Sequence, residues 1–355
     1  MQSSLPRVVR VTGNFGGQAP LSEVVRSAIS AAFDAGWADP KKLSQASTRS
    51  RILESQALES IATGLGLAVH EIEVVGEEEL APYLALSGFL SPTKELAIGA
   101  IDRGKIRALS RTHASHRIIP VDQHGALVAD EIPKGSVLSL QVANGETGIL
   151  QDLPTLSLKA ECVVLDATTS GSRVDLGSNW DAAVFSSASW GGPQGIAILG
   201  IRNSAQWRYP LPHIAPIRTP GGYSLPLLLA ASVALENFAE DSLHISALNQ
   251  HLRKSILAAI PGTYCVGDHE NSLPHLLTII LPETISEMVV RDLDAVGITV
   301  EAGSACSPVD LAPSHVLAAM GLPTEGAIRI RLRDNHNESD IDELVNALVK
   351  VCSDL

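Results

Sequence analysis

Short apolar runs of strand length alternate with longer amphipathic segments through the first two thirds of this chain. The runs are rich in β-branched residues and lie over Val137–Val142, Glu161–Leu165 and Ala182–Ser186. Helical spacing of apolar residues marks Leu21–Phe33 and Ser50–Leu65. Parallel strands have this continuous apolar character because helices cover both faces of their sheet. The alternation therefore predicts an α/β domain built on a mostly parallel sheet.

Small or polar residues follow three of the expected strands. The strand over Glu71–Val75 ends at Gly76, the run before Asp166 ends in that carboxylate, and Ser186 to Ser189 follow the third run. In parallel sheets, ligands bind beyond the carboxyl ends of the strands. We therefore expect Gly76, Asp166 and Ser186 to Ser189 to share one crevice.

After Phe238 the pattern changes to strands and helices of a smaller α+β domain. Helices are expected over residues 243–260, 285–296, 314–320 and 338–352, and strands over residues 275–281, 298–301 and 327–332. Arg329 and Arg331 both lie on the last of these strands, and we expect only one of them to face the crevice.

Composition narrows the possible partners of the chain. Its 355 residues carry a formal net charge of −13, which makes it a poor candidate for binding nucleic acid or an anionic membrane surface. The N-terminal residues have no apolar core of a signal peptide, and the apolar stretch Tyr223–Leu235 is too short to span a bilayer. The four cysteines are far apart and lack zinc-ligand spacing, so we expect a reduced, cytoplasmic protein.

The loop Gly303-Ser304-Ala305-Cys306-Ser307-Pro308 is the sharpest local feature. Its small residues and its proline predict a tight, exposed turn, and an accessible thiol with a lowered pKa is reactive. The alternative is an inert cysteine, which is the more common role of a lone cysteine.

The other candidate features have equally plausible structural roles. Asp166 could pair with a ligand or cap a turn. His113 and His116, with His124 nearby, lack a third ligand at recognisable spacing, so no metal site is predicted. The glycine-rich run from Gly191 to Gly195 lacks the lysine of a phosphate-binding loop and is interpreted as a structural turn.

Long stretches of the chain resemble one family. The carboxyl-terminal stretches are Leu273-Pro-His-Leu-Leu, Gly297-Ile-Thr-Val-Glu-Ala-Gly-Ser-Ala-Cys306-Ser, Leu311-Ala-Pro-Ser-His-Val-Leu-Ala-Ala-Met-Gly-Leu and Ala327-Ile-Arg329. Weaker upstream matches include Asn144-Gly-Glu, Val164-Leu-Asp166-Ala and Ser186-Ser-Ala-Ser189. These stretches resemble the cysteine desulfurases, pyridoxal-phosphate (PLP) enzymes of the class V aminotransferase superfamily and of fold type I.

The resemblance implies a fold and a set of roles. It implies a large domain with a mostly parallel, seven-stranded sheet over residues 20–236, and a small α+β domain formed by residues 1–19 with residues 237–355. In such enzymes a lysine holds PLP, an aspartate pairs with its ring nitrogen, and a loop cysteine accepts the substrate sulfur. Asp166 and Cys306 stand at the last two of these positions. Arg329 stands where the arginine that binds the substrate carboxylate belongs, and Asn144 lies in the segment that contacts the ring and the substrate.

Other positions depart from the family pattern. Ser189 replaces the PLP lysine, Ala188 the histidine before it, and Arg103 the histidine that stacks on the ring. The phosphate-binding turn of the family falls at Gly76 and continues here as Glu77-Glu78. Ser186 stands at a further cofactor-binding position. Gly221 replaces a phosphate-binding threonine. Two carboxylates facing a phosphate dianion would oppose its binding.

From these departures we expect PLP to be absent or very weakly bound. The chain is then a degenerate cysteine desulfurase homologue with a binding, scaffold or regulatory role in sulfur transfer or iron–sulfur assembly. The alternative is an active enzyme, either a PLP-dependent desulfurase with another lysine or a PLP-free thiol carrier that uses Cys306. The family's two-fold interface predicts a homodimer, with a heterodimer with an active paralogue as a variant.

Overall fold

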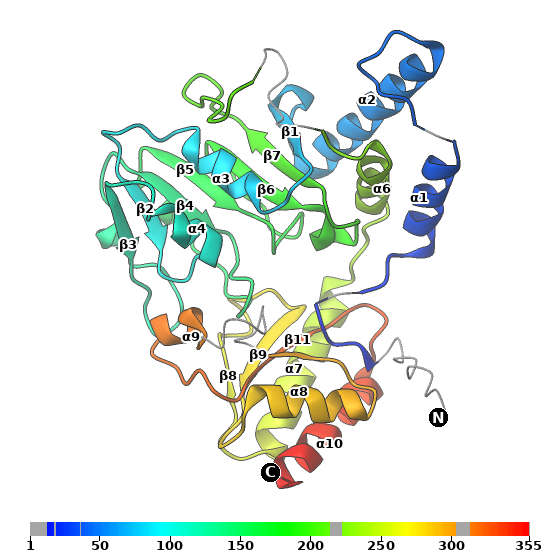
Figure 1. The fold of residues 1–355 in the computed structure, drawn as a ribbon. Coiled ribbons are helices and arrows are strands. Elements are labelled where there is room, and N and C mark those ends of the chain that lie inside the picture. Colours follow the sequence, from blue (N-terminus) through cyan, green and yellow to red (C-terminus); the bar gives the residue numbers. More distant parts are fainter. Residues whose placement is uncertain (1–12, 18, 36, 214–221, 303–312, 355) are drawn as a thin grey trace, which may run out of the picture.

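A computed structural model describes residues 13–17, 19–35, 37–213, 222–302 and 313–354. These residues form two units, each built on its own sheet, and Figure 1 shows the larger unit above the smaller one. The predicted α/β class with a mostly parallel sheet is confirmed.

A seven-stranded sheet forms the centre of the larger unit. In spatial order its strands are β1 (Ile72–Val75), β7 (Ala197–Ile201), β6 (Ala182–Ser186), β5 (Cys162–Asp166), β4 (Val137–Gln141), β2 (Leu96–Gly99) and β3 (His116–Ile119). Neighbouring strands are parallel except at β7, which is antiparallel to both β1 and β6. The other six strands therefore have their carboxyl ends at one edge of the sheet.

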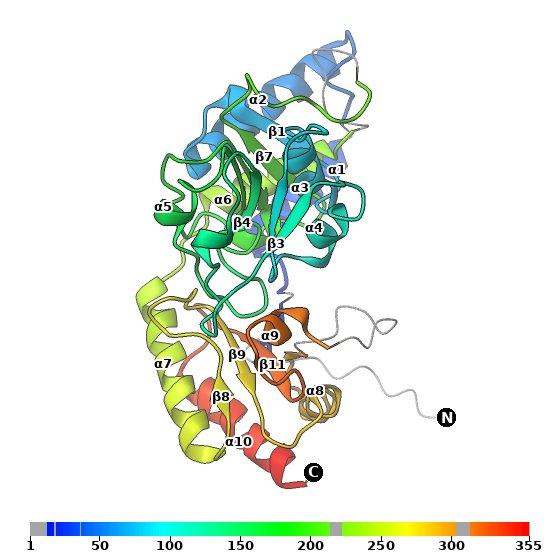
Figure 2. The same cartoon turned by 90° about the vertical axis from the view of Figure 1, so that its left-hand side faces the viewer.

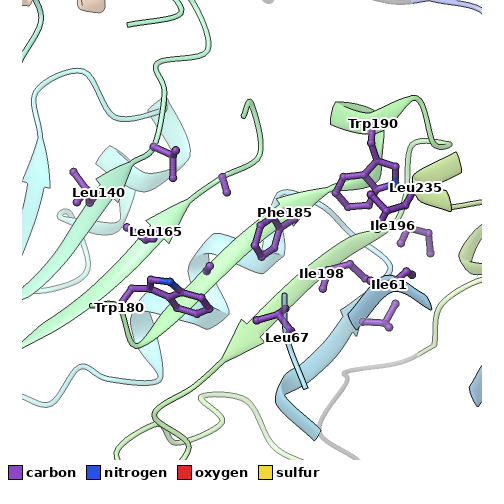
Figure 3. Packing of buried hydrophobic residues seen from close by; sticks show 14 of the residues in the cluster. Ile61, Leu67, Leu140, Leu165, Trp180, Phe185, Trp190, Ile196, Ile198 and Leu235 are labelled. Atoms are coloured by element: carbon purple, nitrogen blue, oxygen red, sulfur yellow. The ribbon is translucent and has the colours of Figure 1, made fainter. Parts of the chain in front are cut away.

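Helices cover both faces of this sheet because successive residues of its strands face opposite sides. Val163 and Leu165 of β5 join one apolar cluster, whereas Cys162 and Val164 join another. Figure 3 shows the first cluster around Phe185. It is covered by α1 (Glu23–Ala35), α2 (Gln45–Leu65) and α6 (Leu225–Glu236), and the second cluster by α3 (Leu80–Ser87) and α4 (Gly104–Leu109). The shorter elements of this unit are α5 (Leu153–Leu156) and the 3₁₀ turns η2 (Val69–Glu71), η3 (Ala129–Glu131) and η4 (Ser187–Trp190).

The smaller unit has a four-stranded antiparallel sheet. Its spatial order is β10 (Glu301–Ala302), β11 (Ala327–Arg331), β9 (Leu276–Ile280) and β8 (Tyr264–Cys265). Three helices share an apolar cluster with β9 and β11, namely α7 (Ser242–Ala259), α8 (Ser286–Ala295) and α10 (Glu338–Asp354). A fourth helix, α9 (His315–Ala319), packs in a separate cluster that includes Ile149 of the larger unit.

Two sequence-based expectations differ from the structure. The strand expected over residues 298–301 is only Glu301–Ala302, and Thr299 instead forms an isolated bridge to Asn14. The edge strand β3 gave no apolar signal because three of its four residues are exposed.

The N-terminal residues 13–17 contact the smaller unit. Phe15 donates its backbone N–H to Thr299 O at 2.8 Å and accepts from Arg331 N at 2.8 Å. Its ring is 1% exposed and belongs to the cluster of β9, β11 and the three helices. These contacts support our proposed division into residues 20–236 and residues 1–19 with 237–355.

The carboxyl edge of the large sheet faces the smaller unit, as the side view in Figure 2 also shows. The loop after β4 makes backbone contacts across this boundary: Leu150 N donates to Asn271 O, and Leu273 N donates to Gly148 O, both at 2.9 Å. The Thr278 hydroxyl of β9 donates to Glu146 O at 2.5 Å. A site at this edge is therefore walled by both units.

The division into two units predicts the effect of Phe15→Ala. Loss of the buried ring should lower the free energy of unfolding by about 3–5 kcal/mol. Because Phe15 belongs to the apolar cluster of the smaller unit, amide exchange should rise in β9 and β11 and not in β4 and β5. Urea unfolding and hydrogen–deuterium exchange measure the two effects.

Leu140→Ala is the matched control, because Leu140 is fully buried in β4 of the larger unit. In Leu140→Ala, amide exchange should rise in β4 and β5 and not in β9 and β11. If both variants raised exchange equally in both sheets, the proposed division would be wrong.

Candidate functional site

Three of the predicted site segments lie at the carboxyl edge of the large sheet. Gly76 follows β1, Asp166 is the last residue of β5, and Ser186 is the last residue of β6. Because these strands run in the same direction, their ends open on the same side, as expected. Arg103 lies at the same edge, in the segment that leads from β2 into α4.

Arg103 forms an ion pair with Asp166. Its Nε lies 3.1 Å from Asp166 Oδ2, and the Asp166 side chain is only 7% exposed. The two atoms face each other at a poor hydrogen-bond angle. Asp166 Oδ1 accepts from the Thr168 backbone N at 3.0 Å and from the Thr168 hydroxyl at 2.5 Å. Asp166 Oδ1 is thus hydrogen-bonded within the chain, whereas Oδ2 has a charge partner in Arg103 but no hydrogen bond in the described structure.

The Glu78 carboxylate lies between the end of β6 and the turn before β7. Its Oε1 accepts from Gly195 N at 3.2 Å, and the Ser186 hydroxyl also interacts with this carboxylate. Burial raises the pKa of Glu78, while Ser186, Gly195 and the charge of Arg103 act in the opposite direction. An anionic group of the protein therefore interacts with the Ser186 hydroxyl, which the resemblance assigns to cofactor binding.

Glu77 does not share this position. It is exposed, and its Oε1 accepts from Glu79 N at 3.1 Å within its own turn. The two neighbouring glutamates therefore point to different places, Glu78 to Gly195 and Ser186 and Glu77 into its own turn. The backbone at Gly222 and Tyr223 approaches Gly76 so closely that a Cβ at residue 76 would lie 2.9 Å from Gly222 O.

Asp102, beside Arg103, is a buried acid that the sequence did not single out. Its Oδ2 accepts from Gly99 N at 3.1 Å, and the side chain is 1% exposed. Burial raises its pKa to about 7, and the nearby charge of Asp166 adds to the rise, while Ser139, Gly99 and Arg103 oppose it. Arg103 is therefore surrounded by three carboxyl groups.

Ser189 offers a hydroxyl where the resemblance expects an amine. Its Oγ donates to Ser186 O at 2.7 Å, and its backbone O accepts from Arg173 Nη1 at 2.5 Å. Ala188 is exposed beside it. The glycine-rich run that follows is a closed turn, as predicted, with Gly191 at φ 76° and Gly192 N donating to Ser187 O at 2.9 Å.

The Arg329 guanidinium also meets groups of the chain itself. Its Nη1 donates to Gly145 O at 3.2 Å, and its Nε lies 3.7 Å from Glu301 Oε2. Glu301 stands directly opposite Arg329 in the pairing of β10 with β11. The sequence alone did not identify Glu301 as a partner of Arg329. An acid that lies opposite a base on the neighbouring strand is recognised only when the strand pairing is known.

Asn144 hydrogen-bonds through its whole side-chain amide to the turn after β4 and its surroundings. Its amide nitrogen donates to Ile101 O at 3.1 Å and to Gln141 Oε1 at 3.0 Å. Its carbonyl oxygen accepts from Glu146 N at 3.0 Å and Thr147 N at 2.9 Å. The side chain is 2% exposed, so its contacts hold the loop that faces the smaller unit.

The expectation that only one of Arg329 and Arg331 faces the crevice is wrong. Residues two apart in a strand lie on the same face. Both residues are half-buried, and the apolar residues that alternate with them in β11 are fully buried. The two guanidinium groups are close enough that the charge of Arg329 helps to lower the pKa of Arg331.

Three further expectations concern other parts of the chain. Cys306 and Gly221 lie outside the described residues. His113 and His116 hydrogen-bond to the backbone of Lys94 and His113, respectively, and the described residues hold no cluster of three potential metal ligands. No helix in the described part of the chain is long and apolar enough to cross a membrane.

Comparisons with known proteins agree with the fold and with the resemblance. The profile of the class V aminotransferase family matches residues 218–344. A cysteine desulfurase of Gluconacetobacter diazotrophicus is 27% identical in an alignment that covers 74% of this chain and 72% of the relative. The cysteine desulfurase IscS of Clostridium botulinum is 25% identical in an alignment that covers 90% of this chain and 88% of the relative.

A solved NifS-like protein is similar in structure, with a TM-score of 0.84 at 22% identity. The match covers 96% of this chain and 99% of that protein. At this identity the similarity establishes the fold and carries no information on the residues of the site.

The buried Asp102 predicts a pH-dependent effect of Asp102→Asn. The folded pKa of about 7 lies above the ordinary value of 3.8, so the folded state binds the proton more tightly than the unfolded state. The stability that protonated Asp102 contributes is therefore lost as pH rises from about 4 to about 7. An asparagine side chain does not titrate and has no such loss. From pH 4 to pH 8 the variant should therefore gain about 2–4 kcal/mol relative to the unmodified protein.

Urea unfolding across that pH range measures the difference. Asp130→Asn is the control, since the Asp130 side chain is 93% exposed and should give a pH-independent difference. A constant difference between Asp102→Asn and the unmodified protein would contradict the assignment.

Proposed function

This chain belongs to the cysteine desulfurase family, and from that premise we propose that it has lost PLP-dependent catalysis. In its place we propose a binding, scaffold or regulatory role in sulfur transfer or iron–sulfur assembly. The observation that carries the proposal is the ion pair of Arg103 with Asp166. It places a protein cation on the carboxylate that, in the family, pairs with the cofactor ring.

The Arg103–Asp166 pair does not fit a PLP ring. In the family, the aspartate stabilises a protonated ring nitrogen, which requires a carboxylate without another cation. Asp166 already has Arg103 as its cation at 3.1 Å. A bound ring would have to displace the Arg103 guanidinium from this carboxylate before its own nitrogen could pair there.

The Glu78 carboxylate does not fit a PLP phosphate. A phosphate held by Gly195 N and Ser186 would lie beside or in place of Glu78. At about 4 Å and an effective dielectric constant of about 20, each pair of like unit charges costs about 4 kcal/mol. That is about half of the free energy of a micromolar complex.

The described lysines offer no evident replacement for the missing amine at Ser189. Lys94 pairs with Glu161 at 3.0 Å, next to the first residue of β5. Asp166 is the last residue of that strand, and at about 3.3 Å per residue the two ends lie about 13 Å apart. Lys105 is nearer to the site along the chain, but it is exposed and pairs with Glu79 at 3.4 Å.

A series of single and combined variants tests the loss of PLP binding. The unmodified protein and Ser189→Lys should both fail to form lysine-bound PLP or to release sulfide from cysteine. Ser189→Lys combined with Arg103→His and Glu78→Gln should recover PLP binding by at least about tenfold over Ser189→Lys alone. Because the three changes act on one ligand, their effects should be strongly non-additive. Absorbance during PLP titration measures binding.

Glu77→Gln provides the matched control within the same turn. When it replaces Glu78→Gln in the triple variant, it should not recover binding, because the Glu77 carboxylate accepts within its own turn instead. Stoichiometric PLP binding and sulfide release by Ser189→Lys alone would contradict the proposal.

We also propose that the chain acts as a cytoplasmic homodimer. Four apolar side chains on or between α1 and α2 are exposed, of which Phe33 is 61% and Leu43 100% exposed. Exposed apolar surface of this kind is typical of an interface between chains. Light scattering should give twice the chain mass of 37.4 kDa, and Phe33→Asp with Leu43→Asp should give monomers.

Leu243→Asp is the control, because Leu243 is 82% exposed on α7 of the other unit and should leave the dimer intact. A monomeric unmodified protein at micromolar concentration would contradict the homodimer. Co-purification of a second, related chain that carries PLP would contradict the homodimer and indicate a heterodimer with a paralogue.

A further inference from the structure

A cavity of about 840 Å³ lies between the two units, beside the turn of Ser189. One wall comes from the larger unit: the start of α1, the end of α6 and the turn after β6. The opposite wall comes from β11 and the residues that follow it. Asp166 and Arg103 are not among its lining residues, so the cavity lies beside the Arg103 cluster and not within it.

Three arginines line this cavity, and two of them have partners. Arg173 donates to both oxygens of Glu240, at 2.7 and 2.6 Å. Arg333 donates to the backbone oxygens of Asn14 and Gly16. The buried Nε of the third, Arg331, has no hydrogen-bond partner among the described residues.

The surroundings of Arg331 are dominated by positive charge. The pKa of its guanidinium is lowered to about 10, first by burial and then by the charges of Arg329, Arg333 and Arg173, while Glu301 acts in the opposite direction. Glu301 is itself shared with Arg329, 3.7 Å away. Among the lining residues, Arg173 pairs with Glu240, Arg333 hydrogen-bonds to backbone oxygens, and the carboxylate of Asp334 also lines the cavity. The three arginines of the described lining therefore face two carboxylates, which leaves one positive charge in excess.

His275 adds an unused polar atom to the same wall. It is 6% exposed, and its Nδ1 has no hydrogen-bond partner within the described part of the chain. Burial and the charges of Arg173, Arg331 and Arg333 hold its pKa well below the ordinary value, so the ring is neutral. A neutral imidazole can donate one hydrogen bond to an anion without adding charge.

The rest of the lining indicates what the anion is attached to. Leu21 and Phe238 line the cavity, are partly exposed and pack against the apolar cluster of the larger unit, whereas Val25 and Trp190 of the same lining are only 1% exposed. Such a lining suits an apolar body, while a planar guanidinium suits a carboxylate. One uncompensated cation matches a monoanion better than a phosphate dianion.

We propose that this cavity binds a small organic monocarboxylate, with the carboxylate on Arg331 and His275 and the apolar part against Leu21 and Phe238. The proposal does not rest on the loss of PLP binding, since the hydrogen bonds and ion pairs of Asp166 and Glu78 in the described structure involve none of these four residues. Binding here would join the two units, because Arg331 and His275 belong to one wall and Leu21 and Phe238 to the other.

Titration calorimetry with hexanoate, benzoate, acetate and inorganic phosphate tests the proposal on the full chain. Hexanoate or benzoate should bind with a dissociation constant of about 1 mM or tighter, and at least about tenfold more tightly than acetate or phosphate. Arg331→Met should weaken that binding at least about tenfold, because a charge-assisted hydrogen bond is lost. Arg291→Met, at an exposed arginine of α8, should leave it unchanged.

Thermal unfolding separates a binding defect from a folding defect. Without ligand, Arg331→Met should melt no lower than the unmodified protein, because it removes an unpaired cation among three arginines. Hexanoate should raise the melting temperature of the unmodified protein but not of Arg331→Met. Equal binding by both proteins, no binding of either carboxylate, or tighter binding of phosphate would each overturn the proposal.

Discussion

The guanidinium of Arg103 is the charge on which the carboxyl edge of the large sheet depends. It pairs with Asp166 at 3.1 Å, and its charge favours the ionised forms of both Glu78 and Asp102. One cation thus serves three carboxyl groups in a buried environment. The chain tolerates this excess of acid because burial raises the pKa values of Glu78 and Asp102, and Asp102 reaches about 7. The crevice between the two units is in this way built around a closed network of the protein's own charges.

Charged groups of the smaller unit are likewise paired with charges of the protein itself. Glu301 stands opposite Arg329 across two paired strands, where a carboxylate of the protein lies at the arginine that the resemblance assigns to a substrate carboxylate. Asn144 likewise satisfies its donors and acceptor within the chain. Asp166, Ser186 and Arg329, which the resemblance assigns to ligand binding, therefore all have charged partners within the chain. The buried Nε atoms of Arg329 and Arg331 both have no hydrogen-bond partner in the described structure. Arg331 differs because Arg329 lies 3.7 Å from Glu301 Oε2, whereas Arg331 has no ion pair among the described residues.

The fold was largely predictable because its signals are local. β4, β5 and β6 are apolar on both faces. Once β1, β5 and β6 are taken as parallel, their ends place Gly76, Asp166 and Ser186 at one edge. The edge strand β3 gave no such signal because it is exposed. The site was predictable as a set of positions but not as a set of contacts. Arg103 and Asp166 are 63 positions apart in the sequence, and only the tertiary fold shows that they neutralise each other. The directions of individual side chains were also not predictable. Glu78 points to Gly195, whereas Glu77 points back into its own turn. The two-residue period of a strand puts Arg329 and Arg331 on the same face.

The central claim is that no lysine of this chain holds PLP, and chemical trapping tests it most directly. The protein is incubated with excess PLP, reduced with borohydride to make any lysine adduct permanent, and analysed by intact-mass and peptide mass spectrometry. The account predicts that the mass remains that of the unmodified chain, apart from scattered, substoichiometric labelling of exposed lysines. One stoichiometric adduct on a single lysine, with Lys105 as the nearest candidate along the chain to Arg103, would contradict it.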